Sequence, residues 1–351
     1  MKKIKNTASV ILAAGKGTRM RSSINKLLHE ISGKPLVRYV TDTVMEAGIE
    51  KNILVIGKNG DEIKKELGNK FKYAIQYKPL GTGHALSTAK SLLKRFSGDV
   101  CVLSGDTPFI TPKIVINLIR KHRQTEADAT LITTIFPETP PYGRIVRDST
   151  GNIIRIVEAK DASPDELKIK EVNTSHYCFK ANVVLPLLSE IKNKNIQKEY
   201  YLTDIIEILA ARKRRIENLL VDDYHIVFGI NTREDLSYAL KLMYQRKNIE
   251  FMNSGVTIID PDSTYIDNTV EIGKDTTIYP FTFIEKNSVI GNNCVIGPFV
   301  KITNSKIEKG CQVQYASVDN STLKKRSTFG PFASLKDGEI QENNKTSFIP
   351  V

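Results

Sequence analysis

The feature that most restricts the fold is a six-residue repeat of large aliphatic side chains in the C-terminal part of the chain. Seven isoleucines lie six positions apart, and the register then continues in steps of five or six residues. The repeat positions are Ile266, Ile272, Ile278, Ile284, Ile290, Ile296, Ile302, Ile307, Val313, Val318, Leu323, Phe329 and Leu335. Helices and flat strands lack this period, whereas a left-handed parallel β-helix buries one aliphatic side chain per hexad and uses three hexads per coil. The thirteen positions therefore predict about four coils within residues 253–340.

The corners of such coils need residues that tolerate a left-handed backbone. Gly273, Gly291 and Gly297 directly follow a repeat isoleucine, and Asn292-Asn293 follows one of these glycines. We expect these residues to form tight corners. Residues 341–351 are polar and lack the hexad, so the sequence predicts a tail outside the coils.

Residues 1–230 follow a different pattern, in which short apolar runs alternate with helical stretches. The predicted strands are Ala8–Ala14, Ile53–Ile56, Tyr73–Gln76, Val100–Leu103, Ala129–Ile135, Val172–Phe179 and Ile216–Val221. The predicted helices span residues 35–47, 82–95, 111–124, 181–192, 202–213 and 232–252. This alternation indicates a mostly parallel α/β sheet covered on both faces, with a ligand crevice at the carboxyl ends of its strands. We expect an antiparallel insertion at 143–158 and a linker helix over 231–252, between two domains.

Composition excludes several classes of protein. The formal net charge is +12, but the lysines and arginines are scattered, which argues against a nucleic-acid-binding module and is compatible with a small polyanionic substrate. Four cysteines without CxxC spacing favour buried free thiols and a reducing compartment. The run Ala8–Ala14 imitates a signal peptide, yet Lys16 and Arg19 follow at once, and no stretch reaches the roughly 20 apolar residues of a membrane span. We therefore expect a cytoplasmic protein.

A glycine-rich segment follows the first predicted strand and reads Leu12-Ala13-Ala14-Gly15-Lys16-Gly17-Thr18-Arg19-Met20. It does not fit the Walker A frame, and Met20 stands where the dinucleotide fingerprint has its third glycine. The backbone N–H groups of such a loop can nevertheless face phosphate oxygens. A glycine-rich loop after a strand is more often purely structural when nothing else accompanies it. Here Lys26 follows Arg19 by seven residues, and the two together make the segment specific for phosphate binding.

With several further motifs in one order, this segment resembles the signature of the sugar-1-phosphate nucleotidyltransferases, in particular the bacterial bifunctional enzymes that make UDP-N-acetylglucosamine. The further motifs are Gly81-Thr82-Gly83-His84-Ala85, Ser104-Gly105-Asp106, Tyr142-Gly143-Arg144-Ile145, Glu158 with Lys160-Asp161, Glu171-Val172-Asn173-Thr174, Tyr200-Tyr201-Leu202-Thr203-Asp204 and Gly229-Ile230-Asn231 with Arg233. The resemblance runs from about residue 8 to residue 337. It implies a Rossmann-like nucleotidyltransferase domain with a mostly parallel sheet, followed by a short left-handed parallel β-helix. It also implies UTP and N-acetylglucosamine 1-phosphate as substrates and Mg²⁺ as cofactor.

The resemblance assigns the charged residues to phosphates and metal. Arg19 is expected to serve the leaving pyrophosphate, and Lys26 the phosphates that stay with the product. Asp106 and Asn231 are expected to hold Mg²⁺, which prefers few oxygen ligands besides substrate phosphates. The alternative, purely structural roles are surface cations for the two basic residues, a turn at Asp106, and a helix cap at Asn231.

The same resemblance implies the residues that contact the base and the sugar. The base is expected to contact Leu12, Ala13, Ala14, Gly15, Gln76, Gly81 and Thr82, and the sugar Ser104, Gly105, Gly143, Glu158, Asn173, Tyr201 and Thr203. The Gln76 amide offers a donor and an acceptor to the edge of uracil. Two positions depart from the family: Ser104 stands where tyrosine is usual, and Ser175 where glycine is usual. Both adjoin the predicted sugar site.

The bifunctional enzymes also acetylate glucosamine 1-phosphate, with a longer β-helix and a histidine base. All five histidines of this chain precede residue 253, so the sequence predicts uridylyl transfer without acetyl transfer. The resemblance further implies a homotrimer assembled through the β-helix. The alternatives are the same chemistry on another sugar 1-phosphate or nucleotide, and a non-catalytic regulatory homologue, which would have lost the cationic and metal-binding residues.

Overall fold

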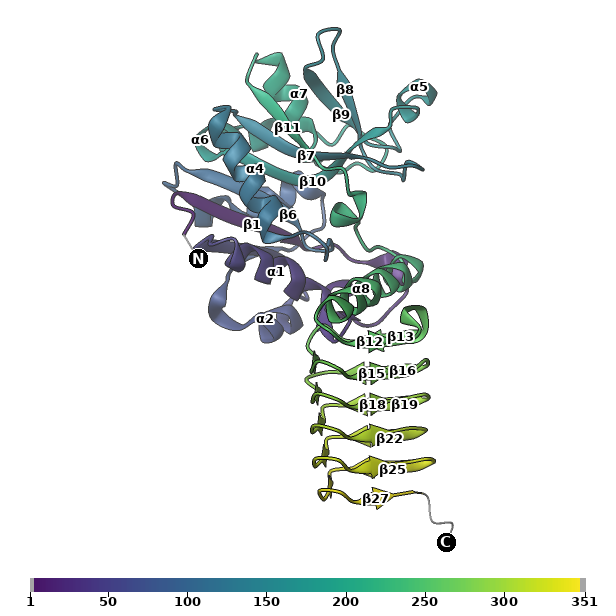
Figure 1. Ribbon diagram of the computed structural model, residues 1–351. Coiled ribbons are helices and arrows are strands. Elements are labelled where there is room, and N and C mark those ends of the chain that lie inside the picture. The colour runs from purple at the N-terminus through teal and green to yellow at the C-terminus, as the bar shows by residue number, and fades with distance from the viewer. Residues whose placement is uncertain (1–2, 348–351) are drawn as a thin grey trace. The chain divides into compact units, whose positions relative to one another are not determined.

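The computed structural model describes residues 3–347, which divide into two compact units (Figure 1). The first contains the described residues up to His29 together with Pro35–Thr232. The second contains Glu30–Lys34 and the described residues from Arg233 onward. The helix that we expected to be a linker, α8 (Arg233–Asn253), therefore belongs to the second unit. No sequence pattern predicted that Glu30–Lys34 would join it.

A nine-stranded sheet forms the centre of the first unit. Its strands run in the order β11-β7-β10-β6-β1-β4-β5, with β8 and β9 attached beside β10. The strands are β1 (Thr7–Ala13), β4 (Lys51–Gly57), β5 (Lys72–Gln76), β6 (Asp99–Ser104), β7 (Ala129–Ile135), β8 (Arg144–Arg147), β9 (Ile153–Val157), β10 (Glu171–Lys180) and β11 (Ile216–Leu220). β10 runs antiparallel to β6 and β7, whereas β1 runs parallel to β4 and β6. The predicted mostly parallel sheet and its antiparallel β8–β9 insertion are confirmed.

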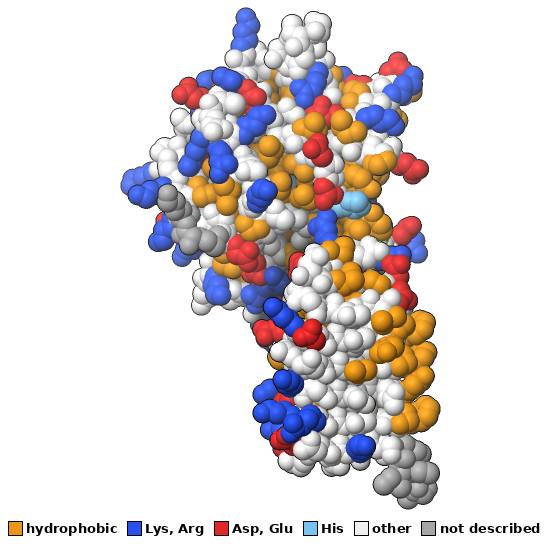
Figure 2. Space-filling view, viewed as in Figure 1, with side chains coloured by type: hydrophobic (Ala, Val, Ile, Leu, Met, Phe, Trp, Pro, Cys, Tyr) orange, Lys and Arg blue, Asp and Glu red, His pale blue; other side chains and the backbone are white. Residues whose placement is uncertain are grey.

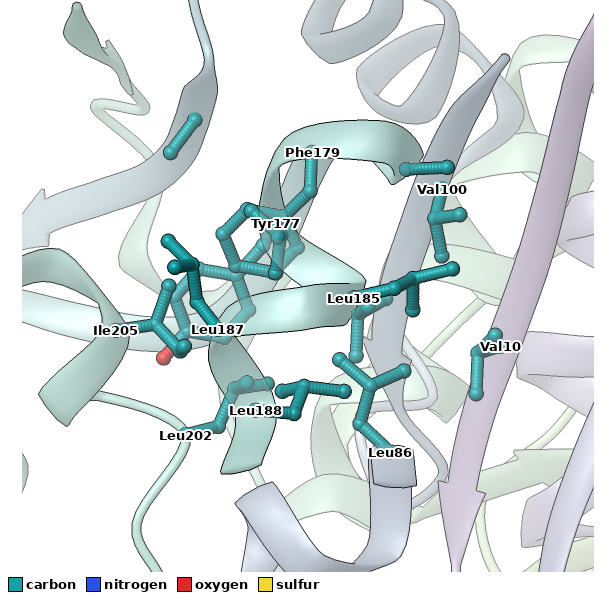
Figure 3. Packing of buried hydrophobic residues seen from close by; sticks show 14 of the residues in the cluster. Val10, Leu86, Val100, Tyr177, Phe179, Leu185, Leu187, Leu188, Leu202 and Ile205 are labelled. Atoms are coloured by element: carbon teal, nitrogen blue, oxygen red, sulfur yellow. The ribbon is translucent and has the colours of Figure 1, made fainter. Parts of the chain in front are cut away.

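Helices cover both faces of this sheet. They are α1 (Leu36–Glu46), α2 (Asp61–Leu67), α3 (Thr82–Ala89), α4 (Pro112–Gln124), α5 (Pro164–Leu167), α6 (Ala181–Leu187) and α7 (Asp204–Ala211). Because side chains alternate across a strand, Val10 of β1 lies in the buried cluster with Leu86 and Leu185 (Figure 3), and the next residue, Ile11, lies in the opposite cluster with Val37. The sequence missed α2, whose seven residues are too few to show a helical period.

The second unit is a stack of coils built from three parallel sheets. One sheet contains β12 (Thr257–Ile258), β15 (Thr277–Ile278), β18 (Val295–Ile296), β21 (Gln312–Val313), β24 (Thr328–Phe329) and β27 (Lys345–Thr346). The second contains β13 (Thr264–Ile266), β16 (Thr282–Glu285), β19 (Val300–Thr303), β22 (Ala316–Asp319) and β25 (Ala333–Lys336). The third contains β14 (Glu271–Ile272), β17 (Val289–Ile290), β20 (Lys306–Ile307), β23 (Thr322–Leu323) and β26 (Glu339–Ile340). A small separate sheet pairs β2 (Glu30–Ile31) with β3 (Lys34–Pro35).

The repeat residues fill the core of these coils, as predicted for a left-handed β-helix. Ile266 pairs in register with Ile284, and Ile284 with Ile302, so that equivalent side chains stack from one coil to the next. The coils extend further than the sequence predicted. β27 pairs with β24, and Thr346 lies opposite Phe329 in the next coil. A polar residue thus continues the register in the segment that we expected to be a tail.

The corners differ in part from expectation. Gly297 has a φ of +96° and Asn293 a φ of +58°, as predicted for tight corners. Gly291 has a different role, because a Cβ there would lie 2.6 Å from the backbone nitrogen of Lys309 in the next coil. Gly273 is needed for the same close approach, toward Asn292.

The four cysteines are free and buried, as the sequence predicted. Across residues 3–347, the helices are all too short or too polar to cross a bilayer.

Candidate active site

A cleft of about 820 Å³ opens in the first unit where β1, β5 and β6 end at their carboxyl side. Among its lining residues are fourteen of those predicted from the sequence: Leu12, Ala13, Ala14, Gly15, Arg19, Lys26, Gln76, Gly81, Thr82, Ser104, Asp106, Glu158, Tyr201 and Asn231. The cleft lies where ligands bind in open α/β sheets. The other four predicted residues, Gly105, Gly143, Asn173 and Thr203, do not line it.

The glycine-rich loop forms one wall of the cleft. It leaves β1 and turns through a short 3₁₀ helix at Thr18–Met20. Gly17 has a φ of +60°, and a Cβ on it would lie 2.7 Å from the Cβ of Lys26, so the loop approaches Lys26 closely. The exposed side chains of Lys16 and Arg19 line the same cleft. This wall can therefore meet a polyanion with backbone donors and three cationic side chains.

Lys26, Asp106 and Asn231 meet at the end of β6. The Lys26 ammonium donates to Asp106 Oδ2 at 2.5 Å and to Asn231 Oδ1 at 3.1 Å. The side chains of Lys26 and Asp106 are 10% and 18% exposed. Local structure fixes the arrangement: the Asn25 side chain accepts from the N–H of Leu27 and caps the turn that carries Lys26.

The backbone ties the other two residues together. The carbonyl of Asp106 accepts a hydrogen bond from the N–H of Ile230 at 3.0 Å, directly before Asn231. The Asn231 amide nitrogen donates to the Gly229 carbonyl at 3.3 Å, which leaves its oxygen facing Lys26. Residues that are far apart in sequence are therefore held at one point.

Asp106 is ionised in this setting. Burial would raise the pKa of its carboxyl group, but the charge of Lys26 and hydrogen bonds from Lys26 and Ser104 outweigh burial and hold the pKa below its ordinary value. The Ser104 hydroxyl donates to Asp106 Oδ1 at 2.7 Å. The buried imidazole of His176, which accepts from the Ser104 N–H, has a pKa lowered to about 4 by burial and is neutral at physiological pH.

The geometry of these groups fits a divalent cation. One carboxylate oxygen and one amide oxygen already converge on a single positive centre, the Lys26 ammonium. Within residues 3–347 no group of three or more His, Cys, Asp or Glu side chains is placed to hold a metal. A site with two protein oxygens suits Mg²⁺, which binds proteins through one or two ligands plus substrate phosphates and water.

Three of the predicted base-binding residues, Gln76, Gly81 and Thr82, lie around the start of α3, and the other four lie at the end of β1. The Gln76 amide nitrogen donates to the Gly81 carbonyl at 3.0 Å and lies 2.9 Å from His84 Nδ1. Gly81 has a φ of +105°, and a Cβ there would lie 2.6 Å from the carbonyl oxygen of Tyr200. His84 therefore positions Gln76, and Gly81 is required by the backbone. Because the amide nitrogen of Gln76 is bonded within the protein, only part of its predicted donor–acceptor edge faces the cleft.

The predicted sugar-binding residues divide into a front and a rear layer. Glu158 lines the cleft and accepts a hydrogen bond from Thr203 at 3.1 Å. Burial raises the pKa of Glu158, and the hydrogen bond from Thr203 only partly offsets this. Asn173 is buried, and its amide donates to Tyr177 Oη at 2.7 Å instead of lining the cleft.

The two glycines predicted for the sugar site, Gly105 and Gly143, lie behind the wall of the cleft. Gly105 donates its N–H to the Leu12 carbonyl, and the Gly143 carbonyl accepts from the N–H of Asn173. A Cβ at Gly143 would lie 2.8 Å from a methyl of Ile156. Both glycines therefore allow close packing beneath the site.

Several lining residues were not predicted as site residues. They are Lys16, Gly17, Thr18, Leu27, Pro79, Ala85, Pro141, Ala159, Lys160, Ser175, Gln197 and Glu199. Lys16 stands inside the glycine-rich motif, and Ser175 was noted only as a departure. Gln197 accepts a hydrogen bond from Lys160, a pair without any local sequence signal.

Comparison with known proteins gives consistent results. Residues 8–225 match the family described as nucleotidyl transferase, and residues 269–304 match bacterial transferase hexapeptide repeats. A protein of Acetivibrio thermocellus named bifunctional protein GlmU is 45% identical over 336 residues, which cover 96% of this chain and 73% of that protein. A protein of the same name from Caldanaerobacter subterraneus is 42% identical over 332 residues, or 95% of this chain and 72% of that protein.

A solved structure of UDP-glucose pyrophosphorylase complexed with UDP-glucose matches in fold. Its TM-score is 0.56 at 21% identity, and the match covers 68% of this chain and 99% of that chain.

Proposed function

Because this chain belongs to the nucleotidyl transferase family and is a GlmU-like protein, we propose that it transfers UMP from UTP to N-acetylglucosamine 1-phosphate. An oxygen of the sugar phosphate attacks the α-phosphorus of UTP, and the bond from that phosphorus to the bridging oxygen of the pyrophosphate breaks. The products are UDP-N-acetylglucosamine and pyrophosphate. In such a transfer the protein mainly positions anions and offsets the charge that develops.

The convergence of Lys26, Asp106 and Asn231 at the end of β6 carries this proposal. When a triphosphate is bound, Lys26 turns toward the phosphates that remain with the product, and Arg19 faces the leaving pyrophosphate. Asp106 and Asn231 then offer their oxygens to Mg²⁺. Bound Mg²⁺ would neutralise charge on the triphosphate and on the transition state.

The cleft residues on either side of this centre divide the substrate between them. Leu12, Ala13, Ala14 and Gly15, together with Gln76, Gly81 and Thr82, contact the uracil and its ribose. Ser104, Glu158 and Tyr201 face the sugar, and Gly105, Gly143, Asn173 and Thr203 support them from behind. The hydrogen bond from Thr203 to Glu158 supports this layered assignment.

Acetyl transfer is not part of the proposed activity. All five histidines precede residue 253, so the described coils contain no imidazole base. The free cysteines suit the reducing cytoplasm, which we propose as the location.

A row of aromatic side chains along the coils supports a homotrimer. Phe281, Phe299, Tyr315 and Phe332 follow one another from coil to coil, with ring centroids 5.0, 5.5 and 5.7 Å apart; the first two pairs are stacked and the third is tilted. They are 40% to 71% exposed, and Figure 2 shows hydrophobic side chains gathered along one edge of the coils. The faces of the first three rings are stacked on one another, so the edges of these rings remain for a partner. Another coil stack has the same repeat of about 4.8 Å between strands and can match every ring of the row.

The assembly is tested by sedimentation. Phe299→Ser should dissociate trimers into monomers, whereas Phe283→Ser, an exposed aromatic outside the row, should not. A wild-type protein that sediments as a monomer, or a trimer that Phe299→Ser leaves intact, would refute the role of the row.

The activity is tested by pyrophosphate release with UTP, dTTP, CTP and ATP against several sugar 1-phosphates. The expected result is highest kcat/KM for UTP with N-acetylglucosamine 1-phosphate, and loss of activity in Asp106→Ala. A preference for another sugar would correct the substrate and keep the chemistry, and the departures at Ser104 and Ser175 make this the main rival. Release of free thiol from acetyl-CoA in the presence of glucosamine 1-phosphate would contradict the absence of acetyl transfer.

A further inference from the structure

Ser104 is the last residue of β6 and lines the cleft beside Asp106. Its hydroxyl donates to Asp106 Oδ1 at 2.7 Å, while the other oxygen of the same carboxylate accepts from the Lys26 ammonium, which also donates to Asn231 Oδ1. An ionised carboxylate can only accept hydrogen bonds, so the Ser104 hydroxyl must be the donor. The two oxygens of Asp106 therefore have separate partners.

Ser104 is itself held in place by three backbone interactions. Its N–H donates to His176 Nδ1 at 3.3 Å, and its carbonyl accepts from the Thr107 hydroxyl at 3.0 Å. β6 also pairs with β1 so that Ser104 lies opposite Leu12. The hydroxyl is thus carried by a rigid strand end, whereas the terminal torsion of an aspartate side chain is soft and broadly distributed.

We propose that Ser104 is a positioning residue for the metal site, and that its hydroxyl fixes the plane of the Asp106 carboxylate so that Oδ2 points at the same place as Asn231 Oδ1, where the Lys26 ammonium lies. This inference rests on the proposed function, in which Asp106 and Asn231 hold the divalent cation. Without the hydroxyl, the carboxylate rotates and its outer oxygen points toward the cation for only part of the time. The residue acts through Asp106 and does not itself touch the metal.

The test measures metal binding directly, with Mn²⁺ as the probe. Mn²⁺ is titrated into protein that is in excess over UTP, and the free ion is quantified by electron paramagnetic resonance, with UTP alone as the reference. Ser104→Ala should raise the dissociation constant of Mn²⁺ about tenfold, which is near the lower end of what one hydrogen bond to a charged group contributes. Ser104→Cys keeps the size of the side chain but is a weak donor, so it should behave like alanine. Ser104→Thr keeps the hydroxyl and should bind Mn²⁺ nearly as well as the wild type.

Kinetics provide a second readout. In Ser104→Ala the Mg²⁺ concentration for half-maximal rate should rise by the same factor, and kcat at saturating Mg²⁺ should largely recover. The matched control is Ser87→Ala, which removes another serine hydroxyl that bonds within α3. It should change neither quantity.

The outcomes separate this inference from the proposed function. If Asp106→Asn abolishes Mn²⁺ binding while Ser104→Ala and Ser104→Cys bind like the wild type, the positioning role of Ser104 is refuted and the metal site stands. If Ser104→Thr is as weak as Ser104→Ala, the hydroxyl is not the cause and the inference is also refuted. If the wild type binds no more Mn²⁺ than UTP alone, the metal assignment fails, and this inference fails with it.

Discussion

Replacing Lys26 with methionine keeps the length of the side chain and removes the ammonium group that Asp106 and Asn231 share. Removing one partner of a fully buried ion pair costs about 3–5 kcal/mol, because the other charge is left without compensation. The Lys26 and Asp106 side chains retain 10% and 18% exposure, so water offsets part of this cost. We expect Lys26→Met to lose about 2–3 kcal/mol of unfolding free energy at pH 7.5.

The loss should depend on pH, and its sign follows from Asp106. In the wild type the pKa of Asp106 lies below its ordinary value, so its contribution to stability is present above the unfolded pKa and is lost as pH falls. In Lys26→Met burial prevails and raises that pKa above the unfolded value, so the contribution of Asp106 to stability is favourable at low pH and is lost as pH rises. The difference between the two proteins should therefore be smaller at pH 4.5 than at pH 7.5.

Urea unfolding followed by circular dichroism measures this difference. The transition to use is the one that moves to higher urea concentration when UTP is added, because UTP binding stabilises the unit that unfolds there. The control is Lys168→Met, which breaks the exposed pair between Lys168 and Asp165 and should cost less than about 0.5 kcal/mol. Adding Asp106→Asn to Lys26→Met should recover much of the stability. A loss no larger than the control's, or one equal at both pH values, would refute the reasoning.

Three further outcomes follow from the structure. Gly81→Ala forces a Cβ to within 2.6 Å of the Tyr200 carbonyl at a φ of +105°, so stability should fall by about 1–3 kcal/mol and the KM for UTP should rise; an unchanged KM would contradict the placement of the base. Ile302→Ala should cost about 2–5 kcal/mol in unfolding experiments, whereas the outward-facing Lys301→Ala should cost almost nothing. Burial, then Glu207 and other carboxylates, raise the pKa of Asp204 to about 6, so the contribution of Asp204 to stability should be lost as pH rises through 6. Asp204→Asn should therefore raise Tm relative to the wild type at pH 7.5 and not at pH 4.5.

The hexad repeat and the alternation of strands and helices could be predicted from the sequence, because the apolar side chains that fill the core recur with a fixed period. Ile266, Ile284 and Ile302 show this, since each occupies the same place in its own coil. The extra strand at Lys345–Thr346 could not be predicted, because its inward residue is a threonine whose place is set by Phe329 in the preceding coil.

The site was predictable where a residue lies inside a motif beside a strand end, as Lys26 and Asp106 do. The sequence did not predict which residues line the cleft and which lie behind its wall. Asn173 and Thr203 carry the same sequence signal as Glu158, yet they lie behind the cleft wall. The register of β10 shifts between Asn173 and Tyr177, and the Asn173 amide bonds to Tyr177. Thr203 bonds to Glu158 from behind. The hydrogen bond from Ser104 to Asp106 needs both side-chain positions and has no counterpart in the sequence pattern.

The in-register stacking of the coils has a consequence for how this part of the molecule can change in length. Each strand contacts its equivalents one turn earlier and one turn later, so removing a whole turn joins surfaces that already complement each other. Removing half a turn instead places corners against flat faces and turns aliphatic side chains outward. The solenoid can therefore be shortened or lengthened only in whole turns, so the length of the second unit changes in discrete steps.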